Sequence, residues 1–140
     1  MRLFLSMLTL SILFGGDAVA QTARKAITTK SGVYSVQQAV RGRDVYAGYC
    51  KSCHTAQTHT GAAFNATWNG RALSELYEYI NERMPKNEPG SLSPQEYADV
   101  LAYVLRINAM PAGDRELPVE STAMQRIRID LTKISVRKDP

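Results

Sequence analysis

The sequence predicts an all-α domain with three main helices. Three segments repeat apolar residues at the spacing of one helical face, and helix-start signals precede two of them. No segment of the 140 residues shows a strand–helix–strand pattern, and no sheet is assigned from the sequence. The formal net charge of +4 is too weak and too dispersed to indicate a nucleic-acid-binding protein.

The first predicted helix begins after Ser35 and runs through Tyr49. Ser35 and Gln38 have the spacing of a capping box, in which each side chain bonds the backbone amide of the other residue. Gly42 lies on the inner face of this helix, where a glycine costs ~1 kcal/mol relative to alanine. We expect this cost to be offset because the missing side chain lets another helix cross at close range.

The second predicted helix spans residues 71–83 and carries its apolar side chains on one face. It should end at Met84, because Pro85 disfavours helical geometry in the residue before it. The third predicted helix starts at residues 93–96, where a serine, a proline and a glutamate stand in the order of a strong helix start. It gives way near Asn108, ahead of a proline and a glycine.

These helices place one domain at residues 35–113. Residues 21–34 are predicted to be a flexible lead-in, and residues 114–140 a C-terminal extension that could hold a short strand or an arm. Residues 54–69 are polar and contain glycine, so a long loop is predicted there. Such a chain has too little side-chain core of its own, and a large, flat, apolar cofactor would complete it.

The N-terminus has the organisation of an export signal. Arg2 is a short positive region, residues 3–14 are apolar, and residues 18–20 form an Ala-x-Ala cleavage site. The apolar run is shorter than the ~20 residues needed to span a bilayer, which disfavours the alternative of a retained membrane anchor. We therefore expect residues 1–20 to be a signal peptide and the mature protein to be periplasmic.

Residues 50–54, Cys-Lys-Ser-Cys-His, form the attachment motif of a c-type haem. One helical turn between Cys50 and Cys53 matches the separation of the two haem vinyl groups, to which the thiols add. His54 would then bind the iron from one side of the haem ring.

Three other interpretations of the two cysteines are weaker. A redox pair would be expected near a strand–helix–strand unit. A disulfide between Cys50 and Cys53 would close a very short, strained loop. A zinc site with His54 and His59 would require Cys53 and His54, which are adjacent in the chain, to turn toward one small ion.

The sixth ligand of the iron would come from elsewhere in the chain. His59 follows His54 so closely that it starts on the wrong face of the haem ring. Met84 lies on a loop between the second and third helices, from which it could reach the opposite face, whereas Met110 and Met124 lie beyond the last helix. We therefore expect Met84 to be the ligand, although methionines in general are more often core residues.

The haem motif and three further segments resemble the monohaem class I c-type cytochromes over residues 32–120. The residues that carry the resemblance are Gly42, Tyr46, Cys50, Cys53 and His54, then Trp68, Gly70 and Arg71, then Met84 and Pro85, and then residues 97–105. Residues 89–93 and 111–113 are similar to the subgroup that accompanies periplasmic quinoprotein dehydrogenases.

The resemblance implies a small class I cytochrome c fold wrapped around one covalent haem c. It also implies that Gly42 and Tyr46 meet the last helix, at Leu101 and at residues 103–104. One departure concerns His54. Relatives usually carry a proline after the haem motif whose carbonyl accepts the other N–H of the axial histidine, and this chain has no proline there.

Two further residues are candidate haem contacts. Trp68 and Arg71 are expected to donate hydrogen bonds to the haem propionates. The alternative is that Trp68 belongs to the core and that Arg71 is a solvated charge.

The expected function is that of an electron carrier, not of an enzyme. With His54 and Met84 both bound, the iron has no open position for a substrate. The expected partners are an exported dehydrogenase as electron donor and an oxidase or another cytochrome as acceptor. Two alternatives remain: a permanently bound electron-transfer subunit of a dehydrogenase, with residues 114–140 as a docking arm, and a haem sensor in which Met84 is labile.

Overall fold

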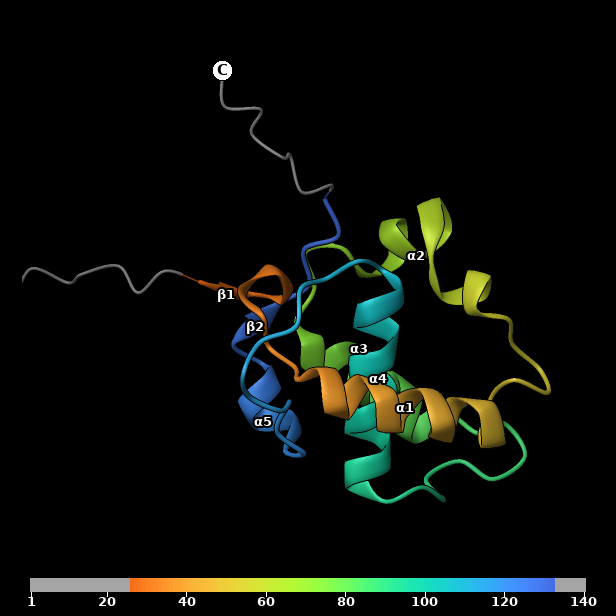
Figure 1. Cartoon of the computed structure of the whole chain (residues 1–140). Helices are drawn as coiled ribbons and strands as arrows, with labels where there is room; N and C mark the ends of the chain where they lie inside the picture. Colours follow the sequence, from red (N-terminus) through yellow and green to blue (C-terminus); the bar gives the residue numbers. More distant parts are fainter. Residues whose placement is uncertain (1–25, 133–140) are drawn as a thin grey trace, which may run out of the picture.

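The structure is a computed structural model that describes residues 26–132. Figure 1 shows that this part of the chain is mostly helical. The predicted signal peptide, residues 1–20, lies outside the described residues, as do the ends of the predicted lead-in and extension. The predicted all-α fold with three main helices, α1, α3 and α4, is confirmed. The elements are β1 (Ile27–Thr28), η1 (Thr29–Ser31), α1 (Val36–Tyr49), η2 (Ala56–His59), α2 (Gly61–Trp68), α3 (Leu73–Arg83), α4 (Pro94–Ile107), α5 (Ser121–Met124) and β2 (Ile127–Arg128).

The backbones of α1 and α4 touch where the two helices cross (Figure 1). A Cβ atom added to Gly42 would lie 1.7 Å from the carbonyl oxygen of Asp99, so the predicted close crossing at Gly42 is confirmed. Its partner is the Asp99 backbone rather than Leu101, whose side chain is fully buried in the core. Tyr46 meets Tyr103 as expected, with the ring centroids 5.2 Å apart.

The ends of the third and fourth α-helices follow their sequence signals. Ser93 Oγ accepts a hydrogen bond from the Glu96 amide at 3.3 Å, and a Glu96 carboxylate oxygen accepts one from the Ser93 amide at 2.8 Å. At the end of α3, Met84 has an extended backbone, as expected before Pro85. Both helix limits were therefore determined by residues within one turn.

The capping box predicted at the start of α1 is only half formed. Ser35 Oγ accepts a hydrogen bond from the Gln38 amide at 3.0 Å, as expected. The Gln38 side chain does not return this bond. It is fully buried, and its amide group pairs with the backbone N–H and C=O of Leu117 at 2.7 and 3.2 Å. Buried backbone groups need partners, and at Leu117 this glutamine supplies them.

The loop predicted over residues 54–69 is wrong for most of that segment, which forms η2 and α2. Phe64 and Trp68 lie one helical turn apart, and each is 8% exposed. Two large apolar residues at this spacing give α2 one buried face. The helix is short, and its other residues are small or polar, so its periodicity was weak in the sequence.

The flexible lead-in predicted before residue 35 is contradicted by the structure of residues 27–34. Strand β1 pairs in parallel with β2, with Ile27 opposite Ile127. Tyr34 is 1% exposed, and its hydroxyl donates a hydrogen bond to the Met110 carbonyl oxygen at 2.6 Å. A two-residue strand is too short to show alternation in sequence, and only its pairing partner, about 100 residues later in the chain, defines it.

The described part of the C-terminal extension, residues 114–132, packs on the domain. Leu117, Met124 and Ile129 are buried in the main hydrophobic core. The short strand, one of the two predicted forms, is present within residues 114–132 as β2. The core thus includes residues on both sides of the predicted limits, 35–113.

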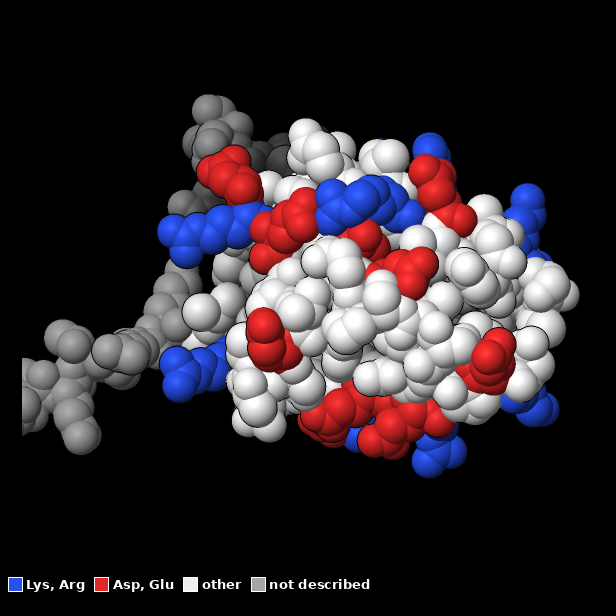
Figure 2. Space-filling view, turned by 90° about the horizontal axis from the view of Figure 1, so that it is seen from below, with Lys and Arg blue, Asp and Glu red and all other residues white. Residues whose placement is uncertain are grey.

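Charged side chains are dispersed over the face of the molecule that Figure 2 shows. Figure 2 shows a face on which basic and acidic groups lie around a broad uncharged area. This face lacks a concentrated basic patch, the feature that would indicate a nucleic-acid partner. Among residues 26–132, no helix combines the length and hydropathy that a membrane span requires.

We expect Gly42→Ala to destabilise the protein by about 3 kcal/mol or more, because two helix backbones must separate to admit the Cβ atom. The measurement is denaturant unfolding of the haem-loaded protein. The control is Gly48→Ala in the same helix, where nothing lies within 4 Å of the added Cβ and about 1 kcal/mol should be gained. Equal stability of the two variants would contradict the backbone contact.

Candidate functional site

The Cys-x-x-Cys-His motif forms a hydrogen-bonded turn directly after α1, whose C-cap is Cys50. The Cys50 amide donates a hydrogen bond to the Tyr46 carbonyl at 2.9 Å, and the Cys53 and His54 amides donate to the Cys50 carbonyl at 3.1 and 2.9 Å. The two cysteines are free thiols, with Cys53 exposed and Cys50 partly buried. Burial raises the pKa of the Cys50 thiol. The one-turn spacing predicted for the two thiols is therefore present.

A zinc site is one of the alternatives that the sequence disfavours. Within residues 26–132, no group of three or more His, Cys, Asp or Glu side chains is arranged to hold a metal ion.

Six aromatic rings form a row beside the motif, which we call the aromatic row. Neighbouring ring centroids in it are between 5.2 and 6.5 Å apart. From α4 to α3, its members are Tyr103, Tyr46, His59, Phe64, Trp68 and Tyr79. The row takes its rings from five elements, and its His59 lies next to His54 of the motif.

One polar atom in the aromatic row has no partner. Among the described residues, the Tyr46 hydroxyl is the one buried side-chain N or O atom without a hydrogen bond. Burial, with the nearby Cys50 and Tyr103 groups, raises the pKa of Tyr46 to about 12. Such an unpaired buried group costs about 1–3 kcal/mol, so it calls for an explanation in a native protein.

The residues present fit a haem c. Cys50 and Cys53 would hold it through their thiols, and His54 would bind its iron. The flat rings of the aromatic row would cover an apolar macrocycle, and the unpaired Tyr46 hydroxyl is a polar atom that the chain by itself leaves unsatisfied. When bound, a haem supplies an iron that gains and loses one electron.

Trp68 and Arg71 lie together at the N-terminal side of α3. Trp68 is buried, and the Arg71 guanidinium carbon lies 4.9 Å from the centroid of its ring. Arg71 Nε also donates a hydrogen bond to Glu75 at 2.7 Å, and this contact lowers the pKa of the Glu75 carboxyl. Arg71 is thus an exposed charge paired with Glu75, and the haem contacts of Trp68 and Arg71 stay predictions.

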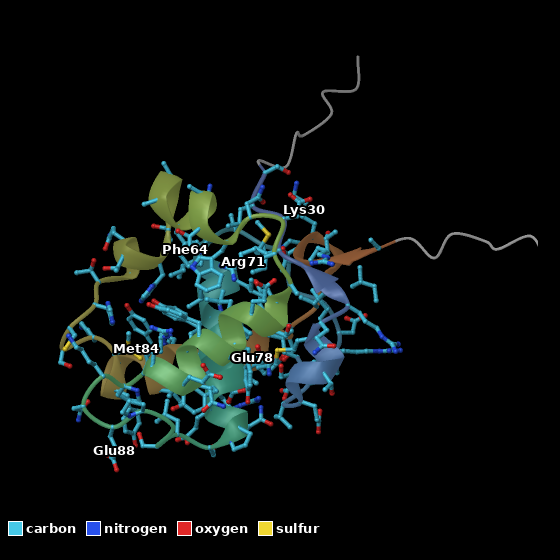
Figure 3. The ribbon with its side chains drawn as sticks, turned by 180° about the vertical axis from the view of Figure 1, so that it is seen from behind. Lys30, Phe64, Arg71, Glu78, Met84 and Glu88 are labelled. Atoms are coloured by element: carbon cyan, nitrogen blue, oxygen red, sulfur yellow. The ribbon has the colours of Figure 1, made fainter. Side chains whose placement is uncertain are left out.

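Met84 follows α3 on the loop that leads to α4. Its carbonyl oxygen accepts a hydrogen bond from the Tyr97 hydroxyl at 2.7 Å, which ties the loop to α4. Figure 3 shows Met84 at one end of α3 and Arg71 at the other. The side chain of Met84 is thus carried by an anchored loop, and its ligand role stays a prediction.

The other two candidate methionines have partners in the core. Met110 is 6% exposed, and its sulfur accepts a hydrogen bond from the Thr29 hydroxyl at 3.3 Å. Met124 is fully buried at the end of α5. Both therefore have packing roles with the terminal segments of the domain.

The structure brings His59 next to His54. The two ring centroids are 5.0 Å apart, and the His59 carbonyl accepts a hydrogen bond from Asn108 Nδ2 at 2.8 Å. Burial, together with the charge of His54, lowers the pKa of His59. Sequence reasoning considered His59 only as an iron or zinc ligand, because no local signal reports which side chain will lie beside His54.

One family model matches a segment that includes the Cys-x-x-Cys-His motif, the aromatic row and Met84. Residues 37–104 match a family model described as Cytochrome C oxidase, cbb3-type, subunit III. The match supports a c-type cytochrome. A cytochrome domain of this kind implies a covalently bound haem c, an all-α class I fold, and haem-based electron transfer rather than enzymatic turnover. No curated protein and no solved structure matches the chain.

The covalent attachment can be tested directly. The unmodified protein should keep its haem through denaturation and acid–organic extraction, because both thiols would be consumed in thioether bonds. Cys50→Ala or Cys53→Ala should leave at most one bond and a much lower yield of haem-loaded protein. Ser52→Ala, at the exposed position between them, is the control and should retain the haem. A haem-free polypeptide with two titratable thiols would overturn the assignment.

Proposed function

We propose that this cytochrome transfers single electrons in the periplasm through a haem c bound by His54 and Met84. In this proposal the donor is an exported dehydrogenase, and the acceptor is an oxidase or another cytochrome. The observation that carries it is the helical turn of residues 50–54 beside the aromatic row, inside the segment that matches a cytochrome family.

Two features support electron transfer rather than chemistry on a substrate. His54 and Met84 would fill both axial positions, leaving the iron no site for oxygen or a substrate. A thioether ligand and a cover of apolar rings favour the less charged ferrous iron, and so raise the reduction potential. The chain's own residues then only hold the haem and set its potential, as a carrier requires.

The proposed compartment and partners are inferred mainly from the sequence. Residues 1–20, which lie outside the described residues, have the organisation of a signal peptide, and covalent haem attachment accompanies export in bacteria. The similarity of residues 89–93 and 111–113 to cytochromes that accompany quinoprotein dehydrogenases supports such a donor. The oxidase named in the description of the matching family supports an oxidase as acceptor.

A second candidate is a permanently bound subunit, because the matching family is described as a subunit of an oxidase. Such a subunit would co-purify with its complex from the native host, whereas a shuttle would be recovered alone. The docking-arm form of this idea loses support, since Leu117, Met124 and Ile129 are buried in the domain itself.

The Met84 ligand has a spectroscopic test. The ferric protein should show the near-infrared band of thioether-to-iron charge transfer, and Met84→Ala should lose it. Met110→Leu and Met124→Leu conserve the volume of the two core methionines and should keep the band. If Met110→Leu alone abolished the band, the ligand would be Met110.

The closed iron site has a kinetic test. The reduced protein should bind carbon monoxide very slowly while exchanging electrons rapidly with a small redox reagent. Met84→Ala should bind carbon monoxide fast, because it opens one axial position. Fast binding by the unmodified protein would instead favour the sensor alternative with a labile Met84.

A further inference from the structure

An iron-bound histidine needs a partner for its second ring nitrogen. Metal-ligating histidines almost always donate this N–H to a carboxylate, a carbonyl or another acceptor, which sets the orientation and the basicity of the ring. The backbone amide of His54 is bonded to Cys50, but no hydrogen bond of its ring occurs within residues 26–132. An acceptor for the second ring N–H of His54 must therefore come from a side chain or carbonyl close to it.

The ring nearest to His54 in the aromatic contacts is that of His59. The two centroids are 5.0 Å apart, with 52° between the ring planes. An N–H···N bond of about 2.9 Å between two imidazoles places their centroids about 5 Å apart, because each nitrogen lies close to its ring centre. The observed 5.0 Å is therefore a separation at which two imidazoles can hydrogen-bond, while in the structure of residues 26–132 the two rings are tilted and do not yet form that bond.

The position of His59 is held from several sides. Its backbone is tied to the C-terminal end of α4 by the bond from Asn108. Its ring lies edge-to-face with Tyr46, at 5.7 Å and 89°, and with Phe64, at 6.5 Å and 73°. A side chain restrained in this way can orient a neighbour, because little of its own freedom remains to be lost.

We propose that His59 is a positioning residue for His54, with a ring nitrogen of His59 accepting the second N–H of the iron-bound imidazole. This inference rests on the proposed ligation of the haem iron by His54. The hydrogen bond sets the plane of the His54 ring and increases its donation to the iron, which stabilises the ferric state.

Two substitutions separate hydrogen bonding from packing. His59→Phe keeps an aromatic ring between Tyr46 and Phe64 but has no acceptor, whereas His59→Gln keeps an acceptor and loses the ring. We expect His59→Phe to shift the ferric–ferrous equilibrium roughly tenfold toward the ferrous form, which is about 59 mV for one electron. His59→Gln should show little of this shift, because its side chain still offers an acceptor to the His54 N–H. A purely structural His59 would give the opposite order, because glutamine disturbs the ring packing more.

A measurement on the unmodified protein makes the test independent of variant folding. In the reduced, diamagnetic state, nuclear magnetic resonance should show a slowly exchanging His54 ring N–H coupled to a His59 ring nitrogen. An N–H that exchanges fast, or that couples to another acceptor, would overturn the proposal.

Different results would contradict the role of His59 and the proposed electron transfer. Unchanged potentials in His59→Phe, with the covalent haem and the Met84 band intact, would remove the role of His59 and leave the electron carrier standing. Absence of His54 from the iron in the unmodified protein would overturn both.

Discussion

The contact between Gly42 and the Asp99 carbonyl brings α1 against α4 at backbone distance, and the position of the haem motif depends on it. The motif begins at the residue that caps α1, so any shift of this helix moves both thiols and His54. The same close approach lets Tyr46 reach Tyr103, where the aromatic row begins. A side chain at position 42 would therefore disturb the site as well as the core.

Polar contacts hold this crossing together. The Asp99 carboxylate is 4% exposed and accepts two hydrogen bonds from Arg41, at 2.8 and 3.0 Å, and one from Gln95 at 2.7 Å. A buried charge is tolerated only when it is paired in this way. Arg41 also bonds Glu116, so the segment after α4 braces the outer side of the same crossing.

The site consists of the haem attachment motif, which is fixed at the end of α1, and the aromatic row beside it. In the aromatic row, His59 connects Tyr46 with Phe64 and Trp68 on α2. This arrangement suits a cofactor whose faces are flat and apolar. It also places a polar ring, His59, beside the imidazole that would bind the iron, where it can influence the electron affinity of the haem.

Local signals by themselves determined the helix limits and the attachment motif. Ser93 and Glu96 start α4, Pro85 ends α3, and the spacing of Cys50 and Cys53 sets one helical turn, because each acts on atoms within a turn of itself.

Only the tertiary structure decided which distant groups meet. It paired the buried side chain of Gln38 with Leu117, added β1 to β2, and set His59 beside His54. Residues far apart in the chain leave no local pattern when they meet. Their contacts arise from the packing of whole helices, which buried Gln38 where a backbone needed partners and brought His59 under the end of α4.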